Sequence, residues 1–176
     1  EGYLNQPEKT AETVIDGWIH TGDVGELDDE GNLRITDRLK DIIITAGGKN
    51  ITPSVMENEL KFSPYISDAV VIGDNRKYLA CLIMIDQENV EHFAQMNSVP
   101  FTDYRSLCAR KEVVSLIGDV VEEVNKGFSS VESIKKFRLI DVLLTAEDDE
   151  LTPTMKLKRS FISEKYSSLI ESMYGE

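Results

Sequence analysis

Residues 79–85 read Leu-Ala-Cys-Leu-Ile-Met-Ile, and residues 69–73 read Ala-Val-Val-Ile-Gly. Both runs are of strand length and contain almost no polar residue. Because a strand with one face in water alternates polar and apolar residues, uninterrupted apolar runs indicate strands that are covered on both faces. The polar residues 74–77 between the runs predict a hairpin loop. We therefore expect two central strands of a sheet.

Helical signals lie on either side of these strands. Thr52 and Pro53 suit the N-cap and the first position of a helix that Ser63-Pro64 ends. From Lys111 to Phe128, apolar residues recur at spacings of three and four, which predicts an amphipathic helix packed on the sheet. The other expected elements are a helix capped by Asp86, a short helix from Thr102, a third strand over 137–144 and a last helix over about 159–173.

The N-terminal part carries a separate strand signal. Residues 18–27 and 33–37 are strand-like, and the turn residues 28–32 between them predict a hairpin. Before them, Pro7 is suited to open a short helix. The sequence thus predicts an α+β fold, in which a small hairpin is followed by a roughly three-stranded sheet packed with helices.

Length and composition limit the class of protein. The 176 residues suffice for one domain of ordinary size and a fragment of a neighbour. The formal net charge of −13 argues against a nucleic-acid binder, because phosphate contacts need a basic face, although a single nucleotide needs only a few local donors. No signal peptide or transmembrane span is visible, so a cytoplasmic protein is expected. Cys81 and Cys108 lack a metal-binding spacing, so we expect buried thiols, and no metal site in this part of the chain.

Charged residues and glycines gather in the stretch from Thr21 to Asn50. Asp23 and Arg38 can together hold a diol, because a carboxylate accepts from two hydroxyls and a guanidinium donates in a fixed fork. The Ala-Gly-Gly run at 46–48 allows a tight turn and the approach of another molecule to the backbone. For any one of these residues alone, two hairpins joined by a charged turn are the better explanation. The functional interpretation depends on the occurrence of all these residues together, in this order, between Thr21 and Asn50.

Three motifs occur in order along the chain. They are Gly17-Trp18-Ile19-His20-Thr21-Gly22-Asp23, Asp37-Arg38-Leu39-Lys40-Asp41 and Pro153-Thr154-Met155-Lys156-Leu157-Lys158-Arg159. In order and spacing they resemble the motifs of the adenylate-forming acyl-CoA synthetase superfamily, and within it the chain is most similar to long-chain fatty acid CoA ligases. Residues 2–13 resemble a fourth motif, so the resemblance covers essentially the whole chain.

The resemblance implies a division of the chain. Residues 1–38 correspond to the tail of the large N-terminal adenylation domain, and residues 39–176 to the C-terminal mobile lid domain, with a hinge at Lys40. The sequence begins with Glu1 inside a family-like motif, and the family's Ser/Thr/Gly-rich phosphate loop is not in it. We therefore expect a piece of a longer protein that is inactive by itself and works with the absent N-terminal domain of the same chain.

Lys156 is the catalytic residue that the resemblance implies. In adenylation, a lysine ammonium group stabilises the charge that develops between the attacking carboxylate and the α-phosphate. Met155 precedes this lysine where many family members have glycine, a departure that the long-chain branch tolerates. The neighbouring Lys158 and Arg159 are interpreted as residues of the helix start or as contacts to the phosphates of CoA.

The resemblance implies two further binding sites. Asp23 is expected to accept hydrogen bonds from the ribose hydroxyls of ATP and of the acyl-adenylate, and Arg38 to assist there. Ala46, Gly47 and Gly48 are expected to line the pantetheine channel of CoA in the second conformation of the enzyme.

The implied activity is that of an AMP-forming acid–thiol ligase. A fatty acid and ATP would give acyl-adenylate and pyrophosphate, with Mg²⁺ bound mainly by the absent domain, and CoA would then form the thioester and release AMP. Two alternatives stay open: adenylation with another acceptor, such as a carrier protein, and a non-catalytic interaction module that kept the lid fold. Acyl chain length, oligomeric state and membrane association of the parent also stay open.

Overall fold

The computed structural model describes residues 2–144, 151 and 157–175. Two compact units divide the chain, Glu1–Ile42 and Ile43–Glu176, and each has its own helices and strands. The division expected between residues 38 and 39 concerns which part of the chain moves as a lid about Lys40. It stays a prediction.

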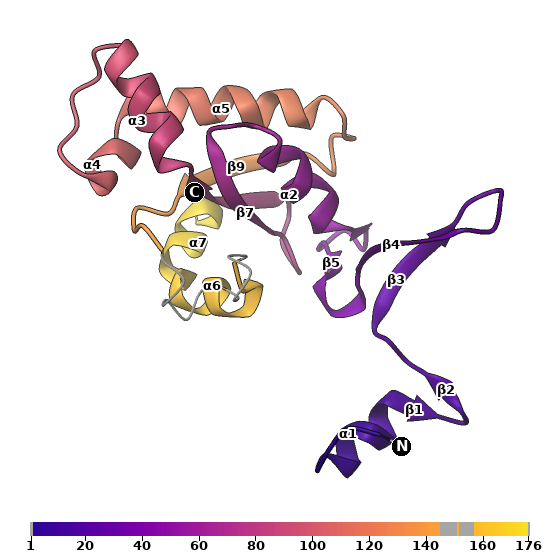
Figure 1. The fold of residues 1–176 in the computed structure, drawn as a ribbon. Coiled ribbons are helices and arrows are strands. Elements are labelled where there is room, and N and C mark those ends of the chain that lie inside the picture. The colour runs from indigo at the N-terminus through magenta and orange to yellow at the C-terminus, as the bar shows by residue number, and fades with distance from the viewer. Residues whose placement is uncertain (1, 145–150, 152–156, 176) are drawn as a thin grey trace. The chain divides into compact units, whose positions relative to one another are not determined.

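The first unit consists of short elements, drawn in indigo and violet in Figure 1. They are α1 (Pro7–Thr13), β1 (Val14–Ile15), β2 (Trp18–Ile19), β3 (Asp23–Leu27), β4 (Leu33–Arg38) and the 3₁₀ turn η1 (Leu39–Asp41). β3 and β4 pair antiparallel, which confirms the predicted hairpin. The single strand predicted over 18–27 is wrong, because Gly22, with a φ of +73°, separates β2 from β3.

The second unit contains a three-stranded sheet in the order β7-β8-β9. Its strands are β7 (Ile66–Ile72), β8 (Leu79–Ile85) and β9 (Ile134–Leu139). β8 pairs antiparallel with β7 and parallel with β9. A short ribbon, β5 (Ile43–Ile44) with β6 (Asn50–Ile51), precedes the sheet. The helices are α2 (Pro53–Lys61), α3 (Gln87–Met96), α4 (Tyr104–Cys108), α5 (Lys111–Asn125), α6 (Arg159–Lys165) and α7 (Ser167–Tyr174). The predicted α+β class is confirmed.

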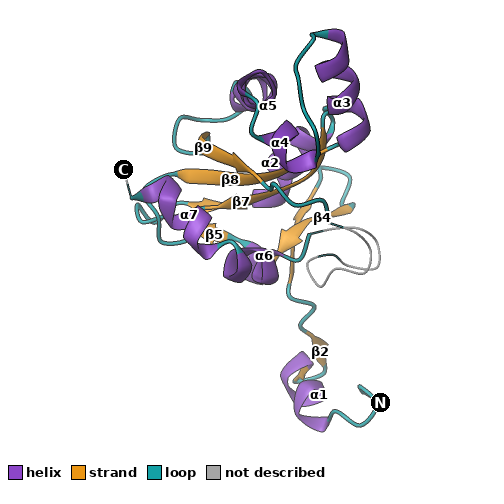
Figure 2. Cartoon of the chain, turned by 90° about the vertical axis from the view of Figure 1, so that its left-hand side faces the viewer, coloured by secondary structure: helices purple, strands orange, loops and turns teal. Residues whose placement is uncertain are grey.

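Helices cover both faces of this sheet, as the apolar strands predict. All seven residues of β8 are buried, and they alternate between two core clusters. Cys81 and Ile83 belong to the cluster that contains α2, α3, α4 and α5, whereas Leu82 and Met84 belong to the cluster that contains α6 and α7. Figure 2 shows α5 on one side of the sheet and α7 on the other. The central strand therefore needs no polar face.

Local signals set several helix ends. The Asp86 side chain accepts the backbone amide of Asn89 at 3.0 Å, so the predicted N-cap of α3 is confirmed. Asp103 caps α4 in the same way and forms a capping box with Ser106. Pro53 begins α2, but the Thr52 side chain that precedes it makes no capping hydrogen bond.

Two predicted elements differ from the structure. The third strand occupies 134–139 instead of 137–144, because its parallel pairing with β8 begins at Ile134, and after Leu139 the chain turns to bury Ile140 in the α6–α7 cluster. The last helix is two helices, because Tyr166 leaves the helical conformation with a φ of −100° and a ψ of 21°. Each half buries its own apolar residue in the same cluster, Ile162 from α6 and Ile170 from α7.

Candidate functional site

The predicted diol-binding residues lie opposite each other across the hairpin of the first unit. The antiparallel register pairs Asp23, at the start of β3, with Arg38, at the end of β4. Arg38 Nε lies 2.7 Å from Asp23 Oδ1, and the two side chains are 60% and 25% exposed. Among the residues that the structure describes, neither side chain has another hydrogen-bonding partner. Carboxylate and guanidinium atoms beyond the pair are thus available to a ligand.

Lys40 lies in η1, directly after this hairpin. Its side chain is exposed, and the flanking residues Arg38 and Ile42 are both extended. A single 3₁₀ turn between two extended residues can change its dihedral angles without disturbing a core. The geometry is compatible with a hinge, and the hinge itself stays a prediction.

The Ala46, Gly47 and Gly48 stretch forms an exposed, well-defined turn between β5 and β6. Gly48 has a φ of +77°, a conformation that favours glycine, and a side-chain atom built at Gly47 would find only the Thr45 hydroxyl within 4 Å, at 3.8 Å. The Thr45 amide donates to the Lys49 carbonyl at 3.0 Å, and the Gly48 amide donates to the Thr45 carbonyl at 2.8 Å. The turn therefore offers open backbone to a ligand.

The sequence reasoning missed what holds this turn. Thr45 is only 5% exposed, and its hydroxyl accepts the Lys49 amide at 3.2 Å. Residues 74–76, predicted only as a polar hairpin loop, hydrogen-bond to the turn and to β5. On its other side, Lys49 Nζ lies 3.0 Å from a carboxylate oxygen of Glu132. A locally polar loop carries no signal for such distant partners, so the pattern could not have identified them.

Lys156 lies outside the described residues, but the residues that flank it are anchored. Leu151 and Leu157 form an antiparallel bridge, and the Leu157 amide donates to Asp68 Oδ2 at 2.9 Å. Arg159 donates to the Glu57 carboxylate and to the Val71 carbonyl, both at 2.5 Å. Of the two interpretations of Arg159, the structure favours the helix start, because its guanidinium is occupied within the fold.

The carboxylate of Glu57 is the most perturbed acid near this segment. Burial raises the pKa of Glu57 above its ordinary value, and this outweighs the nearby Arg159 guanidinium and the donating Val71 amide, which both lower it. Asp68 is also buried and lies 3.3 Å from Lys61 Nζ. These two acids hold the start of α6 against α2 and β7, so we assign them a structural role.

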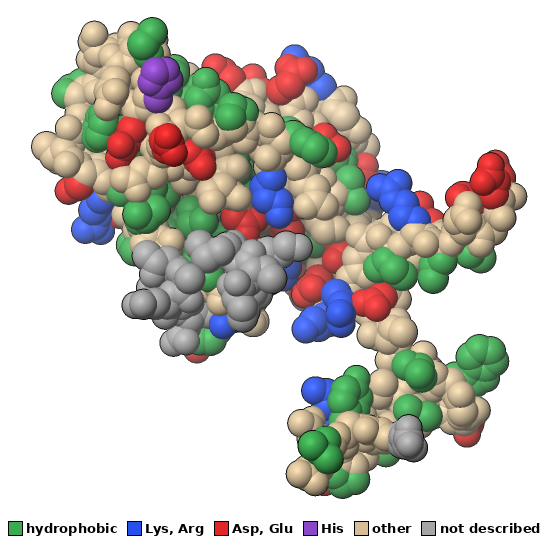
Figure 3. Space-filling model, viewed as in Figure 1, with side chains coloured by type: hydrophobic (Ala, Val, Ile, Leu, Met, Phe, Trp, Pro, Cys, Tyr) green, Lys and Arg blue, Asp and Glu red, His purple; other side chains and the backbone are tan. Residues whose placement is uncertain are grey.

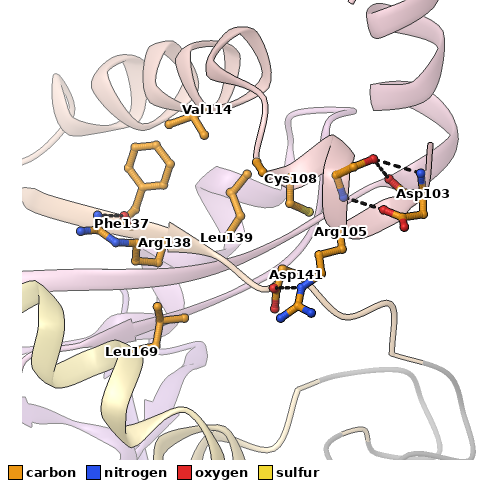
Figure 4. A pocket seen from close by; sticks show the side chains of 11 residues that line it. Asp103, Arg105, Cys108, Val114, Phe137, Arg138, Leu139, Asp141 and Leu169 are labelled. Atoms are coloured by element: carbon orange, nitrogen blue, oxygen red, sulfur yellow. Dashed lines mark hydrogen bonds and ion pairs between the residues drawn. The ribbon is translucent and has the colours of Figure 1, made fainter. Parts of the chain in front are cut away.

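A separate cavity of about 620 Å³ lies in the second unit, where α4, β9 and α7 meet (Figure 4). An ion pair between Arg105 Nε and Asp141 Oδ2, at 2.8 Å, closes one side. Cys108 lines it, but burial raises the pKa of this thiol to about 11, so it is protonated at neutral pH. Among the residues that the structure describes, no predicted site residue lines this cavity.

Other features bear on binding only indirectly. Both cysteines are free and buried, as predicted. Within the described residues, no group of three or more His, Cys, Asp or Glu side chains is placed to hold a metal ion. None of the described helices has the length and apolar character required to cross a bilayer. On the face shown in Figure 3, acidic and basic side chains lie interspersed.

Comparison with known proteins identifies the family. The model of the AMP-binding enzyme C-terminal domain matches residues 40–176. The chain is 43% identical, over 176 residues, to the long-chain-fatty-acid–CoA ligase FadD15 of Mycobacterium tuberculosis, with 99% of the chain and 29% of that protein covered. It is 38% identical to the human long-chain-fatty-acid–CoA ligase ACSBG1, over 194 residues that cover 99% of the chain and 27% of that protein.

Solved structures agree with this assignment. The adenylation domain of a carboxylate reductase from Mycobacterium chelonae matches with a TM-score of 0.80 at 28% identity, over 99% of the chain and 26% of that structure. A fatty acyl CoA synthetase from Mycobacterium tuberculosis matches with a TM-score of 0.52 at 28% identity, over 96% of the chain and 28% of that structure. The chain spans less than a third of the curated relatives it matches. On these grounds the chain belongs to the AMP-binding enzyme C-terminal domain family, the C-terminal part of adenylate-forming enzymes.

Proposed function

We propose that the chain is the C-terminal part of an ATP-dependent long-chain fatty acid CoA ligase. The observation that carries the proposal is the pair of the half-buried Asp23 and the exposed Arg38, which stand opposite each other with atoms free for a ligand. Asp23 would accept the ribose hydroxyls of ATP and of the acyl-adenylate, and Arg38 would orient that carboxylate. The identity to CoA ligases, 43% in one relative, supports this assignment.

Lys156 would act in the first half-reaction. The fatty carboxylate attacks the α-phosphorus of ATP, and pyrophosphate leaves with the electron pair of the broken P–O bond. An ammonium group at the reacting oxygens stabilises the developing charge. Mg²⁺ would be bound mainly by the absent N-terminal domain.

The second half-reaction would use the turn of Ala46, Gly47 and Gly48. After rotation of residues 39–176 about Lys40, the turn would line the path of the pantetheine arm of CoA. The CoA sulfur forms a bond to the acyl carbon, the bond from that carbon to the phosphate oxygen breaks, and AMP leaves with the electron pair. Both half-reactions need the absent domain, so the chain alone is expected to be inactive.

A carboxylate-activating enzyme with a different acceptor is the alternative. The carboxylate reductase adenylation domain matches with a higher TM-score, 0.80, than the fatty acyl CoA synthetase, 0.52. Carboxylate activation is common to both proposals, and they differ in the acceptor. Activity with CoA, compared with activity with a carrier protein, separates them.

The test uses the full-length parent with Lys156→Ala and assays the half-reactions separately. Fatty-acid-dependent ATP–pyrophosphate exchange should fall by on the order of a hundredfold or more, while thioester formation from ready-made acyl-adenylate and CoA should survive. Lys126→Ala, an exposed lysine at the end of α5, is the matched control and should change neither rate. Unchanged exchange in Lys156→Ala would refute the assignment and favour a non-catalytic interaction module.

A further inference from the structure

The loop between β7 and β8 holds the glycine turn by three hydrogen bonds. The Ile44 amide donates to Asp74 Oδ1 at 3.1 Å, and the Asn75 amide donates to the Ile44 carbonyl at 2.8 Å. The Ala46 amide donates to the Arg76 carbonyl at 2.9 Å. These bonds fix both peptide groups of Ile44 and the first residue of the turn. The position of the turn is thus set by this loop as well as by its own strands.

The side chain of Arg76 ties the same loop to the last helix. Arg76 donates to both carboxylate oxygens of Glu171 in α7, with Nη1 and Oε2 3.2 Å apart, and its guanidinium lies 4.7 Å from the centre of the Tyr174 ring. A two-pronged contact to a carboxylate together with ring stacking fixes the plane of the guanidinium. One residue thus contacts α7 with its side chain and the glycine turn with its carbonyl.

Two tyrosines hold the two ends of the loop. The Tyr174 hydroxyl lies 3.0 Å from the Ile72 carbonyl and 3.2 Å from the Tyr78 carbonyl, and it shares its one proton between these two acceptors. The Tyr78 hydroxyl donates to the Met173 carbonyl at 2.5 Å, and the two rings lie 5.0 Å apart. Residues near the end of α7 therefore contact this loop at three places: at its first end, at its second end and, through Arg76, at its centre.

The pair of Arg76 and Glu171 is expected to contribute little to the free energy of folding. Its side chains are 35% and 60% exposed, and ion pairs at such positions add little stability. α7 is already docked by Ile170 and Met173, which are buried in the core. The pair instead restricts the orientation of an otherwise exposed loop that carries the glycine turn.

We propose that Arg76 is a positioning residue for the use of CoA. Arg76 holds the turn of Ala46, Gly47 and Gly48 in the orientation that the pantetheine arm of CoA requires. This rests on the proposed function, in which that turn lines the CoA path. Arg76 serves only the second half-reaction. The C-terminal helix α7 is then part of the support of the CoA site.

The test compares variants of the full-length parent in the two half-reactions. Arg76→Ala should raise the KM for CoA roughly tenfold in thioester formation from acyl-adenylate, while ATP–pyrophosphate exchange stays within about twofold. Glu171→Gln should act in the same direction, and Arg76→Lys should recover only part of the loss, because an ammonium group cannot reproduce the planar fork. Arg105→Ala, which removes a comparable exposed pair with Asp141, is the matched control and should leave both half-reactions unchanged.

Two further measurements separate the possible failures. A thermal melt of Arg76→Ala should coincide with that of the unaltered protein, which excludes misfolding as the cause. Gly47→Leu places a side chain on the open face of the turn and should itself impair use of CoA. If Gly47→Leu has no effect, the assignment of the turn is wrong and the role of Arg76 falls with it. If Gly47→Leu impairs CoA use but Arg76→Ala does not, or if Arg76→Ala lowers both half-reactions equally, only the role of Arg76 is refuted.

Discussion

Arg159, the first residue of α6, donates to the carboxylate of Glu57 in α2 at 2.5 Å, across 102 positions of the sequence. The side chains are 26% and 13% exposed, so both charges are largely removed from water. The same carboxylate accepts the Val71 amide at 2.8 Å, and the same guanidinium donates to the Val71 carbonyl. One ion pair therefore joins two helices to the edge strand β7.

Breaking this pair should destabilise the second unit. Glu57→Ala leaves the Arg159 charge buried without its partner, which costs about 3 kcal/mol of the free energy of unfolding. Urea unfolding of the 176-residue chain, followed by circular dichroism, measures this change. Lys126→Ala removes the exposed pair with Glu123 and should leave the unfolding midpoint in place. A loss in Glu57→Ala no larger than in this control would contradict the structural role.

The same carboxylate should make stability depend on pH. Burial raises the pKa of Glu57 above its ordinary value of 4.5, so the folded state binds this proton more tightly than the unfolded state. That contribution is fully present below pH 4.5 and is lost as the pH rises through the raised pKa. The charged groups around the carboxylate are Arg159, Asp68 and, beside Asp68, Lys61.

Glu57→Gln keeps the shape of the side chain but has no titrating carboxylate, so it isolates the contribution of this group to the pH dependence. The free energy of unfolding of the unaltered chain, relative to the Gln variant, should fall as the pH rises from 4.5 and then level off. Urea unfolding at a series of pH values measures the difference. If instead the free energy of unfolding of the unaltered chain, relative to the Gln variant, rises with pH, the attraction of Arg159 exceeds the cost of burying the carboxylate.

The sequence predicts the elements whose signals are local. The unbroken apolar run of β8 indicated cover on both faces, and the two core clusters confirm it. Asp86 indicated a helix start, and its capping hydrogen bond is present. The opposition of Asp23 and Arg38 follows from the hairpin register, once the turn between the strands is recognised.

Features that depend on distant partners could not be predicted. β9 begins with the buried Ile134, but the polar Lys135 and Lys136 that follow it gave no strand signal, and the parallel pairing with β8 makes this segment a strand. Arg76 looked like any loop residue, because its partners, Ala46 and Glu171, lie 30 and 95 positions away. Local pattern contains no information about contacts at such separations.

Gly118 lies in the interior of α5, where glycine weakens a helix. A side-chain carbon built there would meet the Phe137 ring at 3.8 Å, an ordinary packing distance. Gly118→Ala should therefore raise the free energy of unfolding by about 0.5–1 kcal/mol. Gly48→Ala, at a φ of +77°, should instead lower it by about 1 kcal/mol. Urea unfolding of both variants measures whether the two changes in the free energy of unfolding have opposite signs. A lower free energy of unfolding in Gly118→Ala would show that α5 has no room for a side chain at this position.

Both thiols should be protected in the folded protein. Cys81 is fully buried and Cys108 is 5% exposed, and burial raises the pKa of both, that of Cys108 to about 11. At pH 8, neither should react with a disulfide reagent within minutes, and both should react in urea. Single Cys→Ala variants assign any reaction that occurs. A fast-reacting thiol in native buffer would contradict the packing around that residue.

Asp23→Asn should weaken the use of ATP through the ribose. The amide accepts hydrogen bonds more weakly than the carboxylate, so the KM for ATP in exchange should rise by on the order of ten- to a hundredfold. With 2′-deoxy-ATP or 3′-deoxy-ATP, which lack one of the hydroxyls, the penalty should shrink, because the bond that the substitution weakens is already missing. Glu26→Gln, an exposed acid on the same strand β3, is the matched control and should leave the KM unchanged. An equal loss with ATP and with both deoxy substrates would place Asp23 away from the ribose and leave its pair with Arg38 as a support of the hairpin alone.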